Sequence, residues 1–189
     1  MKNVYLEVGA YSLKKVKQFY TEHKNEEWYF ELFEPNPIRI DRINYETTLY
    51  NIPNVNLHCV AVASENCKRN FYLGKGKFGQ AAASLFCEKG RLSGEFICVD
   101  CIDFNEWIIN NLNKYDNIYM NMDIEGAEYE VLPCMIKGES IYYMKSVEIE
   151  FHYKDFQRHQ EIYMKFENVH KELKQFFDSF NAEKVLLKL

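Results

Sequence analysis

The segment from Tyr119 to Leu132, YMNMDIEGAEYEVL, decides the fold. A short apolar run passes through acidic residues and a glycine into a helical pattern, which predicts a strand that feeds a helix. In an open α/β sheet, ligands bind at the carboxyl ends of the strands. Asp123 closes the predicted strand, so we expect its carboxylate at this edge. Glu128 fits a first helical turn, where it complements the helix dipole.

Composition and charge narrow the class of protein. The 189 residues are enough for one hydrophobic core, and a hydrophobic content of 47% indicates a globular chain. We therefore expect a single domain over residues 1–189. The net charge of −5 argues against duplex DNA or another extended nucleic acid as the main partner. Neither a membrane-spanning run nor a signal peptide is visible, which favours a cytoplasmic protein without a membrane partner.

Six cysteines raise the question of disulfides or a metal centre. Only Cys98 and Cys101 have CxxC spacing, and the sequence contains no second CxxC pair. We therefore expect free thiols and no metal-binding residues. Within a strand, a spacing of three residues turns these two thiols to opposite faces.

The N-terminal region predicts a nucleotide-binding turn. A strand over Val4–Val8 opens into Gly9, Ala10, Tyr11 and Ser12, and apolar residues at helical spacing follow. Ser12 is the expected N-cap of that helix. Backbone N–H groups at such a turn point at a ligand, although a dinucleotide fingerprint would need further glycines after Gly9.

A second strand is expected over Trp28–Phe33, followed by Glu34. An acidic residue at this position suits hydrogen bonds to ribose hydroxyls. Asn36 and Pro37 fit the cap and first residue of the next helix, which should run over Ile38–Tyr50. Its expected core contacts are Ile40, Ile43, Thr47 and Tyr50. The next predicted strand covers Val55–Ala63, with His58 packed inside it rather than binding a ligand.

The motif GKGKFG at residues 74–79 has the letters of a dinucleotide fingerprint. It follows a short strand, Phe71–Leu73, and lacks the capping signal and helix that a phosphate loop requires. We interpret it as a hairpin loop beside the substrate, where Lys75 and Lys77 would meet an acidic or phosphorylated acceptor. A strand over Phe96–Ile102 follows, and then a capping box of Asp103 and Glu106.

The C-terminal third supplies the last predicted elements of the sheet. A strand over Lys145–Phe151 ends at His152, which either faces the crevice or pairs locally with Asp155. A long amphipathic helix over Phe156–Phe180 and one final strand over Val185–Leu189 complete the chain.

These motifs occur in an order that resembles the FkbM-type methyltransferases, which use S-adenosylmethionine. The series EVGAY, FEPNP, VAVAS, SL, DIEGAE and EIEFH extends from Tyr5 to His152. Tyr11 replaces the usual Asn, and Asn121 stands where the family commonly has Lys. The resemblance implies an α/β fold with a Rossmann-like class I methyltransferase sheet, mostly parallel, with helices on both faces. One final strand in place of two implies a C-terminus that is shortened, in a domain that is either minimal or excised from a longer chain.

The resemblance also implies a function, namely O-methyl transfer to a hydroxyl of a sugar or other small molecule. The partners would be a small-molecule or glycan acceptor and other domains of a longer chain. The alternative is a catalytically silent Rossmann-like domain that serves as a binding or assembly module. Asp123 and His152 are the expected catalytic residues, and Glu125, Glu150 and His152 the expected substrate contacts. The expected contacts of S-adenosyl-L-methionine are Glu7, Gly9, Ala10, Tyr11, Glu34, Asn36, Val62, Ser64 and Asp123.

Overall fold

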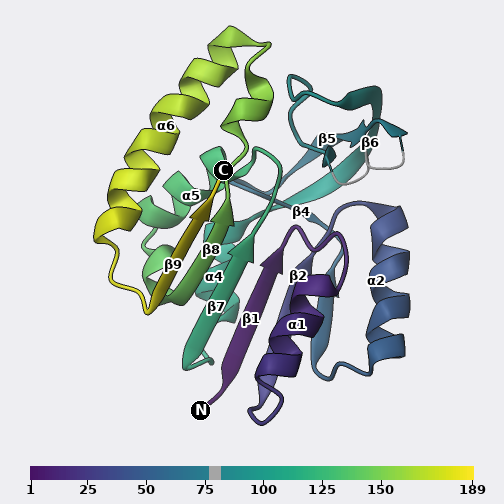
Figure 1. Cartoon of the computed structure of the whole chain (residues 1–189), viewed down its shortest axis with the longest axis vertical. Coiled ribbons are helices and arrows are strands. Elements are labelled where there is room, and N and C mark those ends of the chain that lie inside the picture. Colours follow the sequence, from purple (N-terminus) through teal and green to yellow (C-terminus); the bar gives the residue numbers. More distant parts are fainter. Residues whose placement is uncertain (77–81) are drawn as a thin grey trace.

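The computed structural model describes residues 1–76 and 82–189, and its centre is a six-stranded parallel sheet (Figure 1). The strand order is β3-β2-β1-β7-β8-β9. Chain order therefore reverses between β1 and β7, which is where ligands bind in open α/β sheets. The Rossmann-like fold predicted from the sequence is confirmed. The strands are β1 (Asn3–Val8), β2 (Trp28–Phe33), β3 (Val55–His58), β7 (Asn117–Met122), β8 (Met144–Glu150) and β9 (Lys184–Lys188).

Helices cover both faces of this sheet, as predicted (Figure 1). Side chains of a strand alternate between faces, so Leu6 in β1 joins one core cluster and Tyr5 joins the other. The Leu6 cluster contains residues of α4 (Phe104–Asn111), α5 (Glu128–Lys137) and α6 (Gln160–Ser179), and the Tyr5 cluster those of α1 (Lys14–Glu22) and α2 (Pro37–Tyr50).

The prediction of one strand over Val55–Ala63 is wrong, because the segment divides between two sheets. After β3, the chain leaves the large sheet and forms β4 (Ala61–Ala63), which pairs in parallel with β6 (Leu92–Asp103). β6 in turn pairs antiparallel with β5 (Cys67–Gly74), which gives the small sheet the order β4-β6-β5. The hydrophobic pattern identifies the apolar run, but it does not show which strand each half of the run pairs with.

β5 and β6 pair antiparallel, and residues 75–91 connect them. Gly74 pairs with Leu92, so the first glycine of GKGKFG ends β5. Half of that motif, residues 77–79 with Lys77 among them, lies outside the described residues. Cys98 is exposed and Cys101 buried, which confirms that their thiols lie on opposite faces of β6. All six cysteines are free thiols.

The start of α1 differs from the prediction that Ser12 caps it. The helix begins at Lys14, and the backbone N–H of Leu13 donates instead to Glu46 Oε2 at 2.9 Å. The carboxylate of Glu46 comes from α2, so a contact distant in sequence replaces the local cap. This contact also explains why a charged residue lies on the buried face of α2.

The other caps follow the sequence signals. Asn36 Oδ1 accepts from the N–H of Ile38 at 3.1 Å, and Pro37 is the first residue of α2. Asp103 Oδ1 accepts from the N–H of Glu106 at 3.0 Å at the start of α4. Both N-caps are confirmed, and each partner lies within three residues. The predicted capping box is only half formed, because the N–H of Asp103 donates to Asn66 Oδ1 at 2.9 Å and not to Glu106.

The buried face of α2 consists of Arg39, Ile43 and Glu46. Ile43 is therefore a core contact as predicted, whereas Tyr50 is exposed.

The C-terminal elements are those expected, with shifted bounds. The helix predicted from Phe156 begins at Gln160, because residues Tyr153–Phe156 form a short 3₁₀ turn first. β9 is the predicted final strand, and it pairs in parallel with β8. Within the described part of the chain, no helix is both long and apolar enough to cross a membrane.

Candidate active site

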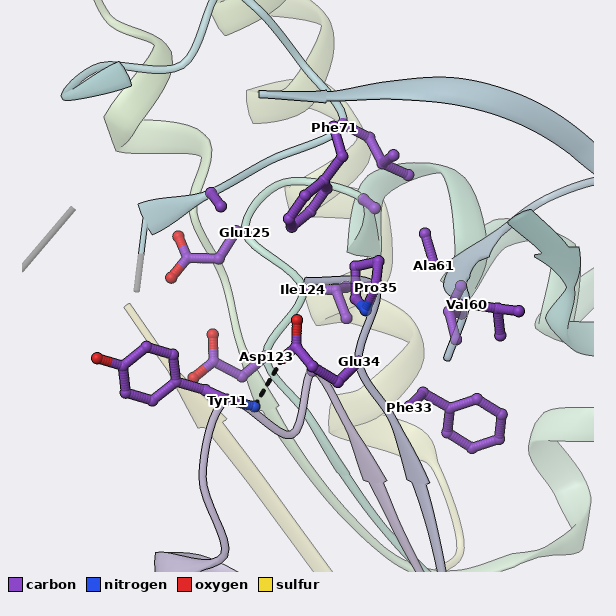
Figure 2. A pocket seen from close by; sticks show the side chains of 15 residues that line it. Tyr11, Phe33, Glu34, Pro35, Val60, Ala61, Phe71, Asp123, Ile124 and Glu125 are labelled. Carbon is purple, nitrogen blue, oxygen red and sulfur yellow. Dashed lines mark hydrogen bonds between the residues drawn. The ribbon is translucent and has the colours of Figure 1, made fainter. Parts of the chain in front are cut away.

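A cavity of about 150 Å³ opens at the carboxyl ends of β1, β2 and β7 (Figure 2). We call it the first cavity. Its wall combines carboxylates with an apolar surface from β2, β4 and β5 and the segments beside them. The lining residues are Gly9, Tyr11, Phe33, Glu34, Pro35, Val60, Ala61, Val62, Phe71, Ala83, Leu85, Asp123, Ile124, Glu125 and Ala127.

Glu34 is held rigidly in this wall by the backbone. Its Oε2 accepts from the N–H of Tyr11 at 2.8 Å (Figure 2) and its Oε1 from the N–H of Asn36 at 2.8 Å. Burial raises the pKa of the carboxyl group, and the two N–H groups oppose that shift. Each carboxylate oxygen has a second lone pair, so Glu34 can still accept from a ligand in the cavity.

Gly9 allows the turn after β1 to pass directly beside the turn after β7. Its φ of +89° lies in the left-handed region, and a Cβ at this position would overlap the backbone carbonyl of Asp123. Tyr11 follows with a φ of +37°. Its hydroxyl accepts from Arg39 Nη2 at 2.9 Å, which fixes the side chain that replaces the Asn of the family motif.

Asp123 lies at the end of β7 as predicted, with its side chain 27% exposed. Its Oδ2 is 3.8 Å from Lys15 Nζ, and its buried Oδ1 has no hydrogen-bond partner among the described residues. Burial raises its pKa, while the charges of His152 and Lys15 oppose the shift. Oδ1 is therefore a buried acceptor atom that no described residue satisfies.

A hydrogen bond from Ser84, in the segment between β5 and β6, fixes the turn after Asp123. Glu125 and Gly126 have φ of +58° and +114°, and a Cβ on Gly126 would approach Phe156 Cζ to 2.7 Å. The fully buried Ser84 donates from Oγ to the carbonyl of Glu125 at 2.7 Å. Ser84 and Leu85, the predicted SL segment, thus contact the site, and Leu85 lines the first cavity.

Glu128 orients His152. The sequence pattern did not predict this contact. Glu128 Oε1 accepts from the backbone N–H of His152 at 2.8 Å and lies 3.1 Å from its Nδ1. The other ring nitrogen, Nε2, is 3.6 Å from Asp123 Oδ1 and 3.5 Å from Glu125 Oε2. Both interpretations of His152 hold in part: its ring faces the crevice and pairs with Glu128, while its backbone carbonyl caps the following 3₁₀ turn and accepts from the N–H of Asp155 at 3.0 Å.

The pKa of His152 is raised above its usual value. Burial opposes the charged imidazolium, but the hydrogen bond and the negative charge of Glu128 outweigh it. Glu128 is itself fully buried and accepts from the N–H of Gly126 at 2.8 Å through its other oxygen. The Glu128 carboxylate therefore fixes both the orientation of the His152 ring and the turn that carries Glu125.

Lys89 is a buried cation in the loop before β6, with a side chain only 1% exposed. It forms ion pairs with Glu125 and with Asp155, the latter at 3.4 Å. Burial lowers its pKa, while the charges of Asp155 and Glu128 act in the opposite direction. No sequence motif marks Lys89, since its role depends on how three loops pack together.

A second, larger cavity of about 520 Å³ adjoins this group, and we call it the second cavity. It brings together Glu125, Glu150 and His152, the three predicted substrate contacts. Glu125 lines both cavities, so they meet at this residue. The other lining residues are Lys75, Ala82, Lys89, Arg91, Phe151, Lys154, Asp155 and Leu189.

Four predicted cofactor contacts, Glu7, Ala10, Asn36 and Ser64, are absent from the linings of both cavities, and their roles stay predictions. Glu7 is 2% exposed, accepts from Asn121 Nδ2 at 2.6 Å and from a tyrosine hydroxyl at 2.9 Å. Burial raises its pKa to about 8. Gly9, Tyr11, Glu34, Val62 and Asp123 do line the first cavity.

Asp123, Glu125 and His152 each offer a ligand atom, and these atoms lie within 4.8 Å of one another. Carboxylate and imidazole groups are common metal ligands. The ammonium group of Lys89, however, already provides a positive charge beside Glu125. Our prediction of a site without metal ligands stays a prediction.

The fold and the geometry define a Rossmann-like α/β domain with a ligand cavity at its switch point and a buried His–carboxylate group beside it. The chain belongs to the FkbM methyltransferase family, because the model of the methyltransferase FkbM domain matches residues 7–180. This match confirms the resemblance seen in the sequence. No curated protein matches the chain.

The crystal structure of Methyltransferase FkbM from Methylobacillus flagellatus KT is a similar solved structure. The two chains share 13% sequence identity, with a TM-score of 0.49. The match covers 79% of this chain and 33% of that protein, so this chain spans about a third of that protein's length.

Proposed function

We propose that the protein is an S-adenosylmethionine-dependent O-methyltransferase that acts on a hydroxyl of a sugar or another small molecule. One observation carries the proposal. Two cavities meet at Glu125, and His152 Nε2 lies at that junction, 3.5 Å from Glu125 and 3.6 Å from Asp123. A methyl donor in the first cavity and an acceptor in the second would then face each other beside a proton-accepting group.

The residues of the first cavity fit the cofactor. Glu34 ends β2 with spare acceptor lone pairs, which suits the two ribose hydroxyls. Apolar residues such as Phe33 and Val62 provide a wall for the adenine ring. The unpartnered Oδ1 of Asp123 suits the positively charged methionine end. When bound, the cofactor supplies a methyl group activated by a sulfonium.

The reaction needs alignment and removal of one proton. A cofactor held by Glu34 and Asp123 would supply its methyl group to the acceptor oxygen, and its sulfur would keep the electron pair of the broken carbon–sulfur bond. We assign the acceptor's proton to His152 Nε2, because Glu128 holds Nδ1–H and leaves the Nε2 lone pair open. Asp123 and Glu125 then stabilise the imidazolium formed. Asp123, whose pKa burial raises, is the alternative base.

Calorimetry with S-adenosylhomocysteine, and separately with NAD, tests the cofactor assignment. We expect binding of S-adenosylhomocysteine with one site and no measurable binding of NAD. Asp123→Asn should weaken that binding, because an amide cannot balance the positive methionine end. Absence of S-adenosylhomocysteine binding would instead favour the catalytically silent module, and NAD binding would favour an oxidoreductase.

A further inference from the structure

Basic side chains from three separate segments form the exposed rim of the second cavity. Lys75 follows β5, Arg91 precedes β6, and Lys154 lies in the 3₁₀ turn after His152. Backbone hydrogen bonds join these segments. The N–H of Lys75 donates to the carbonyl of Arg91 at 2.9 Å, and the N–H of Gly90 donates to the carbonyl of Asp155 at 2.9 Å. The three cations therefore converge because the main chain places them there.

The acidic residues of the same cavity are Glu125, Glu150 and Asp155, and we call the part around them, Lys89 and His152 the inner end. Lys89 forms ion pairs with Glu125 and Asp155. Glu150 lies 4.0 Å from His152 Nε2. Three carboxylates and one lysine leave this inner end acidic while His152 is neutral.

The rim differs from the inner end. Across residues 1–76 and 82–189, the structure shows no ion pair that involves Lys75, Arg91 or Lys154. The cavity thus has an acidic inner end beside the proposed base and a positive outer end. Such a separation of charge attracts and orients an anionic ligand.

We propose that the second cavity takes an acceptor that carries an anionic group, a carboxylate or a phosphate, held by Lys75, Arg91 and Lys154 while its hydroxyl faces His152. This inference rests on the proposed function, since it names the substrate class of the same site. Charge-assisted hydrogen bonds to the rim fix one end of the acceptor. The other end is thereby directed to the junction of the two cavities.

Three matched sugars test this proposal by calorimetry on protein saturated with S-adenosylhomocysteine. The probes are glucuronic acid, glucose 6-phosphate and glucose. We expect at least one anionic sugar to bind about tenfold more tightly than glucose, because three exposed ion pairs each contribute modestly. The preference should shrink at high salt, which screens exposed charges. Comparison of the two anionic sugars shows whether the rim selects carboxylate or phosphate.

Two triple variants identify the residues responsible. Lys75→Gln, Arg91→Gln and Lys154→Gln together should abolish the preference and leave the affinity for S-adenosylhomocysteine unchanged. The control removes the same three charges from exposed lysines in segments that enter strands at the opposite edge of the sheet, and should keep the preference. It combines Lys2→Gln, Lys24→Gln and Lys114→Gln.

The outcomes separate this inference from the proposed function. Equal binding of all three sugars, or a preference that survives in the rim variant, overturns the anionic acceptor while cofactor binding still stands. If S-adenosylhomocysteine does not bind the parent protein, the proposed function fails. The sugar titrations without it then still decide whether the rim selects anions.

Discussion

Glu128 contacts His152 twice through one carboxylate oxygen, at 2.8 Å to the backbone nitrogen and 3.1 Å to Nδ1 of the ring. The first contact fixes the main chain at the end of β8, and the second fixes the ring. Nε2 consequently points to the carboxylates of Asp123 and Glu125. A residue at the start of α5 thus determines which nitrogen of His152 is free to accept a proton.

Glu128→Gln should move the acid limb of the pH–rate profile to lower pH. His152 accepts a proton only when neutral, so kcat/KM should rise as pH passes its raised pKa, above about 6.5. The variant removes the negative charge that raises this pKa, while burial, which lowers it, remains. Glu130→Gln, two residues along α5 and paired with Arg69, is the control and should keep the parent's profile. An unchanged midpoint in Glu128→Gln would contradict the assignment.

His152→Ala should lower turnover by about 10²-fold to 10⁴-fold, the usual contribution of a general base. Affinity for S-adenosylhomocysteine should stay almost unchanged, since the ring lines the second cavity and not the first. Acceptor-dependent formation of S-adenosylhomocysteine and calorimetry measure the two quantities. His159→Ala, at an exposed histidine, controls for loss of an imidazole. Full turnover in His152→Ala would show that His152 is not the base, and Asp123 would then be the candidate.

Glu34→Gln should weaken S-adenosylhomocysteine binding by about 10-fold to 100-fold, because hydrogen bonds to a charged group are lost. Calorimetry gives the affinity, and a thermal melt shows whether the turn after β1 stays folded. Glu31→Gln is the matched control, since Glu31 lies in the same strand, is buried, and pairs with His58 outside both cavities. If the parent and Glu34→Gln bind S-adenosylhomocysteine with equal affinity, Glu34 does not bind the ribose hydroxyls.

Gly9→Ala should destabilise the protein more than Gly94→Ala. The two glycines have nearly equal φ, +89° and +92°, so an alanine is placed in the left-handed φ region in both variants. Only at Gly9 does a Cβ overlap another group, the carbonyl of Asp123, whereas nothing lies within 4 Å of a Cβ on Gly94. We expect an additional loss of about 1–3 kcal/mol in the free energy of urea unfolding, typical of overpacking. Similar losses in both variants would mean that the two turns do not need this close approach.

Treatment with EDTA should change neither turnover nor the melting temperature. Glu125 is already paired with the ammonium of Lys89, so the carboxylates beside His152 have a positive partner from the protein itself. A loss of turnover that Mg²⁺ restores would show that Asp123, Glu125 and His152 bind a cation. Lys89→Met would then be expected to strengthen that cation binding.

The positions of Asp123 and His152 could be predicted because they follow apolar runs. Parallel strands end at one edge of a sheet, so any two such residues are brought to the same side. Glu34 was found for the same reason. Local caps such as Asn36 were predicted because their partners lie within three residues.

The parts of the site that were missed depend on partners distant in sequence. Glu128 looked like a helix-dipole residue, since its two hydrogen bonds to His152 cross 24 positions. Lys89 has no local signal because packing alone places it against Glu125 and Asp155. Val55–Ala63 was wrongly predicted as one strand, because an apolar run does not show which strand each part of it pairs with.

Glu125 belongs to the walls of both cavities, and its main chain and side chain are tied to Ser84 and Lys89 respectively. A ligand that shifts this residue from either side changes the free energy of binding on the other. Thermodynamic linkage requires any such effect to be reciprocal, so the two ligands would alter each other's affinity by the same factor. If cofactor and acceptor bind as proposed and either one shifts Glu125, the two binding events are cooperative, with a sign set by the position of its carboxylate in the ternary complex.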